Sequence, residues 1–266
     1  MKEISSIQNA TFKSVVKLDK KRNREKSNSF LIEGIREVQL AMQSGVEIRE
    51  LIFNSKAIDE GIPEQFSASD QVVHYHFTDE IFSKIAYRDR VSNVVAIATI
   101  EPKDLSSLTE SDPRLIVVLE AVEKPGNLGA IFRTCDAAGV DAVLISNQHT
   151  DIYHPNLIRA SLGSIFSTPF YVCSNEEAEQ FLSSNDFSVF TTYLEGSVPH
   201  YDVDMSGRTA LVLGSEAEGV TEFWVHSAEK CIKIPMNGQV DSMNVSTAAA
   251  VVIYEAVRQQ NHSENV

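Results

Sequence analysis

Residues 115–119 are five consecutive apolar side chains, Leu-Ile-Val-Val-Leu, and they restrict the possible folds more than any other feature. A strand that is apolar on both faces is typical of parallel sheets, because helices cover both faces of such a sheet. A Pro125-Gly126 turn follows, and residues 127–138 then predict a helix that ends at Gly139. Strand, turn and helix together predict an α/β fold with a mostly parallel sheet.

The same alternation continues to the C-terminus. Further strands are expected at 140–146, 168–173, 188–192, 210–214 and 231–235, and helices at 156–162, 176–184, 221–227 and 242–260. The first hundred residues predict a smaller α/β layer, with strands at 30–33, 48–53, 72–77 and 94–100 and helices at 7–20, at 35–43 and from Thr78. Ser6 is the expected N-cap of the first helix.

A polar segment, residues 101–113, separates the two layers. It contains Pro102 and Pro113 and shows no apolar period, which is typical of a linker between domains. We therefore expect one domain over residues 1–100 and a second over residues 114–266.

Charge is distributed unevenly along the chain. The net charge is −14, yet residues 1–30 carry eight Lys and Arg against three acids, so that the remaining 236 residues carry −19. Phosphate contacts need Lys and Arg, so this distribution predicts a local phosphate-binding arm on an acidic protein. A solvated, lysine-rich helix end fits the same charges equally well.

Other sequence features bear on location and cofactors. Three scattered cysteines without a CxxC pair fit reduced thiols, so a cytoplasmic protein is expected. No apolar run approaches the roughly 20 residues that cross a bilayer, and no membrane association is expected. His74 and His76 alternate on a predicted strand, but no third ligand is evident, so we expect no metal site.

Three segments rich in glycine and small polar residues each follow or end a predicted strand: residues 123–133, 212–219 and 234–246. Open α/β sheets bind ligands at the carboxyl ends of their strands, and glycine lets the backbone approach a ligand closely. Each segment alone is also compatible with a tight turn and a helix cap. Together they predict a ligand site in the second domain.

In this order, the segments resemble the three signature motifs of the SpoU/TrmH-type RNA methyltransferases of the SPOUT superfamily. The matching stretches are Asn127-x-Gly-Ala-Ile-x-Arg133-Thr-Cys, Leu213-Gly-Ser-Glu216-x-x-Gly219 and Ile234-Pro-Met-x-Gly-x-x-x-Ser242-Met-Asn244-Val-Ser246. The resemblance covers about residues 114–260. Arg24 to Gly34 and Arg159 to Ser164 resemble the rRNA-directed branch of the family, and the first domain resembles its L30e-like substrate-binding domain in element order.

The resemblance implies a C-terminal trefoil knot, a homodimer with the site near the subunit interface, and S-adenosylmethionine as cofactor. The implied activity is methyl transfer to a ribose 2'-hydroxyl, in 23S rRNA, with tRNA as an alternative substrate. A non-catalytic RNA-binding or ribosome assembly protein of the same fold is a further alternative. The residues that match functional positions of the family are Asn127, Arg133, Glu216, Ser242 and Asn244 for catalysis and Gly214, Ile234 and Met243 for cofactor binding.

Chemistry restricts the implied roles. A guanidinium stays charged in proteins and accepts no proton, so Arg133 is a poor general base and is expected instead to bind the phosphate beside the target ribose. Arg133 and Asn127 are expected to face one crevice, and Glu216 to organise neighbouring loops. Ser242 and Asn244 are expected to face RNA. The expected RNA contacts elsewhere are Lys20, Lys21, Arg22, Arg24 and Arg159.

Overall fold

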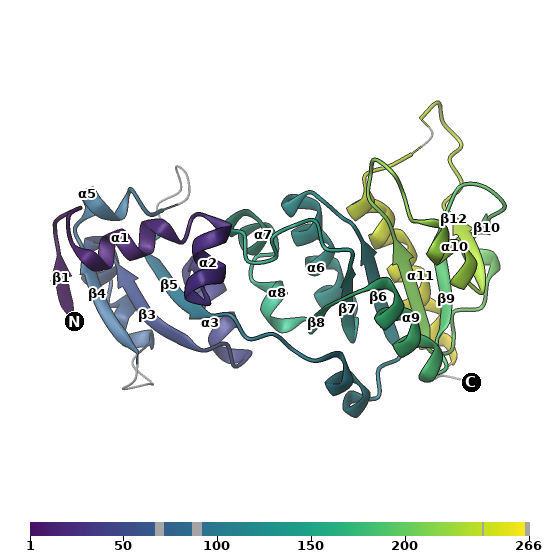
Figure 1. Cartoon of the computed structure of the whole chain (residues 1–266), viewed down its shortest axis with the longest axis horizontal. Coiled ribbons are helices and arrows are strands. Elements are labelled where there is room, and N and C mark those ends of the chain that lie inside the picture. The colour runs from purple at the N-terminus through teal and green to yellow at the C-terminus, as the bar shows by residue number, and fades with distance from the viewer. Residues whose placement is uncertain (67–71, 87–91, 241, 264–266) are drawn as a thin grey trace. The chain divides into compact units, whose positions relative to one another are not determined.

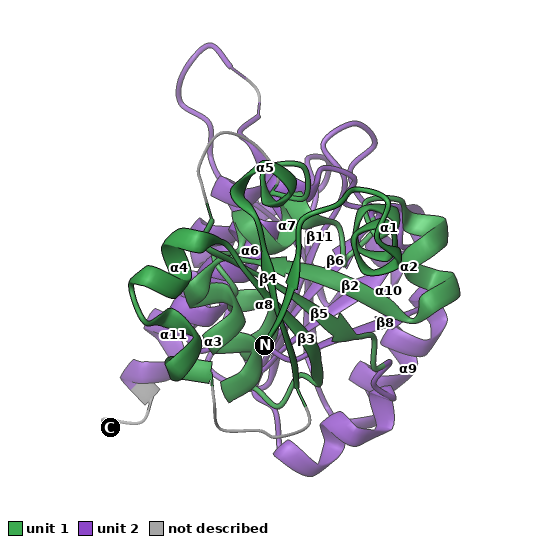
Figure 2. Cartoon of the chain, turned by 90° about the vertical axis from the view of Figure 1, so that its left-hand side faces the viewer, with its two compact units in different colours: residues 1–101, 151–167 green, residues 102–150, 168–266 purple. Residues whose placement is uncertain are grey.

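The chain is described by a computed structural model over residues 1–66, 72–86, 92–240 and 242–263, with only the backbone described at residue 263 (Figure 1). It forms two compact units, drawn in separate colours in Figure 2. Unit 1 comprises Met1–Glu101 and Asp151–Ser167, and unit 2 comprises Pro102–Thr150 and Thr168–Val266. Residues 151–167 thus pack with the first unit, whereas the sequence assigns them to the second domain.

Unit 1 contains a mixed five-stranded sheet in the order β1-β4-β3-β5-β2. β5 pairs antiparallel with β2 and β3, and the β1–β4 and β3–β4 pairs are parallel. The strands are β1 (Lys2–Ile4), β2 (Ser29–Glu33), β3 (Ile48–Phe53), β4 (Val73–Phe77) and β5 (Val94–Thr99). The helices are α1 (Ala10–Lys17), α2 (Lys21–Ser27), α3 (Ile35–Gln43), α4 (Ser55–Asp59), α5 (Asp79–Phe82), α7 (Pro155–Ala160), α8 (Ser164–Ser167) and a 3-10 helix at Ile62–Phe66.

The basic N-terminal region differs from the prediction. A single helix was expected at residues 7–20, but α1 is shorter and a second helix, α2, follows it. The cap of α1 is Asn9, not Ser6, because the Asn9 side chain accepts a hydrogen bond from the Thr11 amide at 2.8 Å. Asn at this position satisfies an amide that has no partner within the helix.

Unit 2 contains a seven-stranded sheet in the order β10-β12-β9-β11-β6-β7-β8, and all its described pairs are parallel. This confirms the predicted α/β fold with a mostly parallel sheet. The strands are β6 (Leu115–Glu120), β7 (Ala142–Ser146), β8 (Phe170–Cys173), β9 (Ser188–Thr192), β10 (Val198–Pro199), β11 (Thr209–Leu213) and β12 (Lys230–Lys233). The helices are α6 (Pro125–Ala138), α9 (Asn175–Ser184), α10 (Glu222–Ser227) and α11 (Val245–Ser263), with 3-10 helices at Leu105–Ser111 and His200–Asp202.

Helices cover both faces of the unit 2 sheet. Ile116 and Val118 of β6 pack in one core cluster with Phe181 of α9 and Trp224 of α10. On the other side α6 packs along α11, which also contacts β11. Every residue of β6 is buried, and the apolar run that led to the fold prediction lies inside the sheet, between β11 and β7.

Residues 151–167 are part of the core of unit 1. The ring of Phe30 in β2 lies 4.6 Å from the ring of Tyr153 and 6.1 Å from that of Phe166, measured between centroids. A Cβ on Gly163 would lie 3.2 Å from the backbone of Glu37 in α3. The two stretches that resemble the rRNA-directed branch, residues 24–34 and 159–164, therefore contribute packing contacts within one unit.

Membrane-spanning helices, the trefoil knot and the L30e-like character of unit 1 are the remaining expectations about the fold. Within the described residues, none of the helices combines the length and the apolar character needed to cross a bilayer. The trefoil knot and the L30e-like character of unit 1 stay predictions.

Candidate active site

A cavity of about 500 Å³ lies in unit 2 at the carboxyl ends of neighbouring parallel strands. Its walls are the residues that end or follow β9, β11 and β12, the first residues of α11, and the residue that precedes α6. Ligands of open α/β sheets bind at this edge, and the volume falls within the roughly 300–1,000 Å³ of small-molecule sites. The lining residues are Lys124, Thr192, Tyr193, Leu194, Leu213, Gly214, Ser215, Glu216, Gly219, Ile232, Lys233, Ile234, Met236, Ser242, Met243, Asn244, Val245 and Ala248.

The second and third sequence motifs meet in this cavity. Six of the predicted site residues line it: Gly214, Glu216, Ile234, Ser242, Met243 and Asn244. Ile234 and Met243 are partly buried, while the side chains of Ser242 and Asn244 are exposed. Parallel strand ends account for this convergence, because β11 and β12 both flank β9 in the sheet.

A pair of asparagines joins the first motif to the third. The Asn244 amide donates a hydrogen bond to the Asn127 Oδ1 atom at 3.1 Å. Asn244 also caps α11, since its own Oδ1 accepts from the Ser246 amide at 3.0 Å. The Nδ2 atom of Asn127 is buried and has no hydrogen-bond partner among the described residues. A buried donor without a partner is costly, so Asn127 is suited to bind a ligand or water oxygen here.

The loop after β11 leaves no room for a side chain on Gly214. A Cβ at Gly214 would lie 2.1 Å from the carbonyl carbon and oxygen of Gly219 and 2.4 Å from the amide nitrogen of Val220. The loop closes through two backbone hydrogen bonds between Ser215 and Gly219, at 3.1 and 3.0 Å. Gly214 is therefore required by close approach of two backbone segments.

Glu216 does not organise this loop as expected. The Ser215 hydroxyl does so, because it accepts a hydrogen bond from the Glu218 amide at 3.1 Å. The carboxylate of Glu216 is exposed at the cavity and forms no hydrogen bond or ion pair with the described residues. It is thus available to a ligand.

The structure places Arg133 apart from the cavity. Arg133 is exposed on α6 and forms no described hydrogen bond or ion pair. Lys124, which lines the cavity, precedes α6 by one residue, so Arg133 lies about 13 Å further along the helix axis. Arg133 follows Asn127 by six positions in the helix, which turns the two side chains about 120° apart. The expectation that both face one crevice is therefore wrong for the single chain.

Several lining residues were missed by the motif comparison. Thr192, Tyr193 and Leu194 end and follow β9, and Lys233 ends β12. The general rule that ligands bind at carboxyl ends of parallel strands would have pointed to these positions. Lys124 stands directly before Pro125, at the start of the first motif.

The buried carboxylate of Glu120 anchors the end of the loop that follows β11. Glu120 ends β6, is 0% exposed and accepts four hydrogen bonds. They come from the Thr221 amide at 2.7 Å, the Thr221 hydroxyl at 2.8 Å, and the side-chain amides of Asn175 at 2.6 Å and Asn147 at 3.2 Å. Asn175 in turn accepts from the Trp224 indole at 3.0 Å. Glu120 thus fixes Thr221, where the loop that starts at Gly214 ends.

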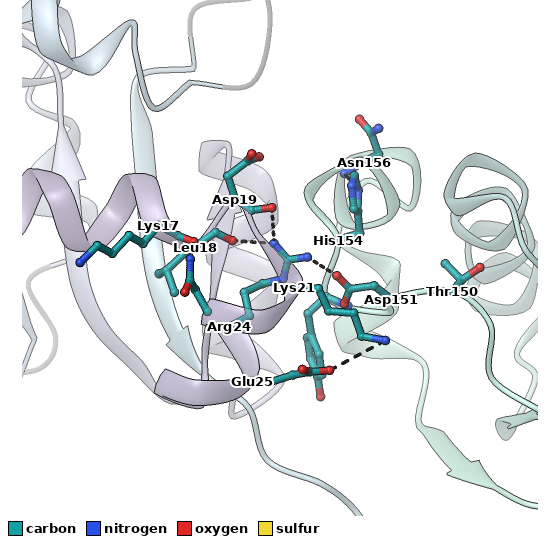
Figure 3. Close-up of polar contacts among 12 residues, drawn as sticks. Lys17, Leu18, Asp19, Lys21, Arg24, Glu25, Thr150, Asp151, His154 and Asn156 are labelled. Atoms are coloured by element: carbon teal, nitrogen blue, oxygen red, sulfur yellow. Dashed lines mark hydrogen bonds and ion pairs between the residues drawn. The ribbon is translucent and has the colours of Figure 1, made fainter.

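Arg24 has a structural role in unit 1. Its side chain is 2% exposed, and one guanidinium nitrogen donates to the carbonyl oxygens of Leu18 at 2.5 Å and Asp19 at 2.8 Å. The other terminal nitrogen pairs with the carboxylate of Asp151 (Figure 3). These bonds satisfy carbonyls beyond the end of α1 and hold the 151–167 segment. Arg24 is therefore corrected from an RNA contact to a packing residue.

The other predicted RNA contacts of unit 1 lie at its surface. Lys20, Lys21 and Arg22 are exposed, and Lys21 forms an exposed ion pair with Glu25 at 3.8 Å. Lys20 and Arg159 line a cavity of about 340 Å³ together, although 139 residues separate them in the chain. Packing of the 151–167 segment into unit 1 brings these two cations together.

The described residues contain no group of three or more His, Cys, Asp or Glu side chains that could hold a metal ion. His76 instead lies 3.3 Å from the Ser55 hydroxyl and 3.9 Å from Glu3, and the ring of His74 packs edge-on against Phe53. Burial lowers the pKa of His74, with a smaller contribution from the positive N-terminus.

Comparisons with known proteins cover both units. The profile of the SpoU rRNA methylase family matches residues 114–254, and that of the MRM3-like substrate binding domain matches residues 9–96. The 23S rRNA (guanosine(2553)-2'-O)-methyltransferase RlmP of Bacillus subtilis (strain 168) is 29% identical over 254 residues, which is 96% of this chain and 98% of that protein.

Solved structures agree with the sequence comparisons. An AdoMet-bound rRNA methyltransferase from Sinorhizobium meliloti has a TM-score of 0.87 and 28% identity, with 97% of each chain covered. An RNA 2'-O ribose methyltransferase has a TM-score of 0.84 and 31% identity, covering 97% of this chain and 99% of that one. The family profile spans more than half of the sequence and contains all three motifs that meet or join at the cavity. The chain therefore belongs to the SpoU rRNA methylase family.

Proposed function

We propose that this protein transfers a methyl group from S-adenosylmethionine to a ribose 2'-hydroxyl of 23S rRNA. The observation that carries the proposal is the convergence of residues 213–219, 232–236 and 242–248 on one cavity at the carboxyl ends of parallel strands. Related proteins support the substrate, since the Bacillus subtilis relative is a 23S rRNA 2'-O-methyltransferase. The AdoMet-bound neighbour supports the cofactor.

The cavity suits S-adenosylmethionine in volume and in lining. Apolar side chains, among them Ile232, Ile234 and Met243, offer contacts for an adenine ring. Polar groups at the same walls, including the Glu216 carboxylate, suit ribose hydroxyls. The absence of a side chain at Gly214 lets the folded loop form this wall.

When bound, S-adenosylmethionine supplies a methyl group on a sulfonium and a neutral leaving group. The protein then has to position the ribose hydroxyl in line with that methyl group. Asn244 holds Asn127 through their hydrogen bond, so the two motifs present their polar atoms as one rigid unit. Ser242 and Asn244 bind the RNA sugar or phosphate, and the hydroxyl proton passes to a phosphate oxygen or to solvent.

We assign Arg133 to an RNA phosphate outside the cofactor cavity. Its guanidinium is exposed and has no described partner, and a charged guanidinium binds phosphate through two parallel hydrogen bonds. RNA extends over several nucleotides, so a contact roughly 13 Å along α6 from the cavity suits a flanking phosphate. This assignment does not require Arg133 to accept a proton.

A homodimer and a cytoplasmic location belong to the same proposal. Unit 2 exposes large apolar side chains, with Leu194 71% exposed, Val240 65%, Tyr201 54% and Tyr254 49%. Such groups indicate a subunit interface where they form one contiguous patch, and sedimentation of the whole chain measures the association. The three free cysteines are in keeping with a reducing compartment.

The activity is tested by incubating the protein with labelled S-adenosylmethionine and separated rRNA and tRNA, followed by mapping of the modified nucleotide. We expect label in 23S rRNA at a 2'-O-methylated ribose. Label in tRNA alone would show that tRNA, and not 23S rRNA, is the substrate. Cofactor binding without transfer to either RNA would indicate a non-catalytic RNA-binding protein.

Substitution of Arg133 by lysine is expected to lower turnover at saturating RNA about 100-fold, because an ammonium keeps the charge but loses the two-pronged contact. Affinity for S-adenosylmethionine is expected to stay unchanged, since Arg133 lies outside the cavity. Single-turnover rates and calorimetric cofactor titrations measure the two effects. Near-normal turnover of Arg133→Lys would exclude the phosphate-clamp role.

Charge reversal of Lys20, Lys21 and Arg22 together is expected to weaken RNA binding and to leave cofactor binding intact. Each lost phosphate contact reduces the slope of log affinity against log salt by about one, so a reduction of roughly two to three is expected. Arg24 is left in place because it is buried in unit 1. Lys56→Glu on exposed α4 is the matched control, and an unchanged salt slope in the triple variant would contradict the assignment.

A further inference from the structure

Unit 1 contains a second cavity, which is lined by three cations and one carboxylate. The cavity, here called the Arg49 cavity, has a volume of about 450 Å³ and lies at the ends of α1 and α2 and the starts of β2 and β3. Three cations line it: Lys17, Lys26 and Arg49. Neither lysine forms an ion pair with a described residue, and Arg49 donates only to the hydroxyl of Ser29. The charges of Lys17 and Lys26, which have no ion-pair partner among the described residues, are available to an anionic ligand.

A β-bulge brings Arg49 and Glu50 to the same cavity. Along β3, Ile48 pairs with Ala98 while Glu50 pairs with Ile97, so Arg49 is an extra residue without a partner in β5. In a regular strand, neighbouring side chains point to opposite faces. The bulge removes this alternation, and both side chains line the Arg49 cavity.

Glu50 is a carboxylate without a hydrogen-bond donor. Its Oε2 atom is buried and has no partner among the described residues. Burial raises the pKa of Glu50, and the neighbouring Arg49 offsets part of this rise. Because a buried acceptor without a donor is destabilising, Glu50 is suited to a ligand that carries N–H groups.

The serine hydroxyls that close this cavity have committed their hydrogens, and Asn23 has committed one of its two amide hydrogens. The amide of Asn23 donates to the Lys17 carbonyl at 2.8 Å, and the Ser27 hydroxyl donates to the Asn23 carbonyl at the same distance. The Ser29 hydroxyl donates to the Ser27 carbonyl at 2.7 Å. The side-chain oxygens of Asn23 and Ser27 are left as acceptors, whereas that of Ser29 already accepts from Arg49. The cavity therefore offers cations for an anion and acceptors for N–H donors.

A ligand that matches this cavity needs a negative group and N–H donors at once. A simple anion would meet the Glu50 carboxylate, and a simple cation would meet three positive charges. A nucleotide carries a phosphate, and the Watson–Crick edge of guanine presents an imino and an amino hydrogen side by side, which the two oxygens of one carboxylate accept together. Cytosine and adenine offer an amino group alone, and uracil offers an imino group alone. Unstacked bases of single-stranded RNA are recognised in this way, and one nucleotide fits the volume.

We propose that the Arg49 cavity binds one unstacked guanosine nucleotide of RNA, with Lys17, Lys26 and Arg49 at its phosphate and Glu50 at its base. The inference rests on the proposed function only in taking RNA as the substrate. It assigns base selectivity to unit 1, separate from the methyl-transfer cavity of unit 2.

The test uses the full-length protein and labelled single-stranded octamers of cytidine, of uridine and of alternating guanosine and uridine. Fluorescence anisotropy is expected to show about tenfold tighter binding of the guanosine-containing octamer than of the uridine or cytidine octamer. Glu50→Gln is expected to remove this preference and to leave affinity for uridine unchanged. The pair Lys17→Gln and Lys26→Gln is expected to weaken binding of all octamers alike and to lower the salt slope by about one to two.

Matched controls and a second measurement separate this proposal from a folding defect. Glu47→Gln and Lys13→Gln alter exposed residues of the same unit outside the cavity and are expected to bind like the wild type. Protection of Lys17 and Lys26 from chemical acetylation by the preferred octamer, read by mass spectrometry, needs no substitution. Equal wild-type affinity for all octamers, or absence of this protection, would overturn the proposal. Octamer preference without methyl transfer to rRNA would instead overturn the proposed function alone.

Discussion

Replacing Gly214 with alanine is expected to weaken S-adenosylmethionine binding about 100-fold, because a misplacement of about 1 Å at a binding site has effects of this size. The new methyl group would lie 2.1 Å from the carbonyl of Gly219 and 2.4 Å from the amide of Val220. These are backbone atoms and cannot rotate away, so the loop that forms one wall of the cavity has to move. Calorimetric titration of the cofactor measures the loss.

The control for this variant is Gly207→Ala. Gly207 lies in the same unit, outside the cavity, and a Cβ there would meet no atom within 4 Å. It is expected to bind the cofactor like the wild type. The crystal structure of the Gly214→Ala variant would show the displaced loop, and unchanged cofactor affinity would show that this loop is not part of the binding site.

Replacing Glu120 with glutamine is expected to lower the free energy of unfolding by about 1.5–3 kcal/mol, the range for hydrogen bonds to a charged group. The carboxylate accepts four hydrogen bonds, whereas one end of the amide is a donor and faces the donors of Thr221 or of the asparagines. The loop from Gly214 to Thr221 loses one of its anchors. Cofactor affinity is therefore expected to fall along with stability, while affinity for RNA octamers stays the same.

Trp224 reports this change directly. It is the one tryptophan of the chain, and its indole donates to Asn175, which itself binds Glu120. Denaturation detected by tryptophan fluorescence therefore reports on the hydrogen bonds that link Trp224, Asn175 and Glu120. Glu229→Gln, an exposed acid of the same unit, is the control. If Glu120→Gln lost stability with full cofactor affinity, Glu120 would support the core and not the position of the loop.

The architecture of the two sheets followed largely from residue patterns. Buried runs such as residues 115–119 identify a parallel sheet, since both of its faces are covered. Strand order and the packing of residues 151–167 in unit 1 depend on contacts across the chain, which local patterns do not encode. The short strand β1 and the helix α2 were missed because three and seven polar-rich residues carry little periodicity.

The residues of the candidate site that belong to ordered sequence motifs were predictable. Those whose role depends on being buried were not. Gly214 and Asn244 belong to recognisable glycine and asparagine patterns. Glu120 is a single acid at the end of an apolar run, and only its burial shows its role. Arg24 is the reverse case, since a basic segment suggests a phosphate contact while the guanidinium caps carbonyls inside the unit. The distance of Arg133 from the cavity depends on the residue at which α6 begins, and the structure places that start at Pro125.

The interleaving of the units has a consequence for the order of events during synthesis. Unit 1 draws on residues 151–167, so it lacks part of its core until residue 167 has left the ribosome. Until then Phe30 has neither Tyr153 nor Phe166, and Arg24 has no Asp151. By that time β6, α6 and β7 of unit 2 have already been made. The N-terminal unit therefore completes its core only after synthesis of the second unit has begun, while residues 168–266 of that unit are still to be made.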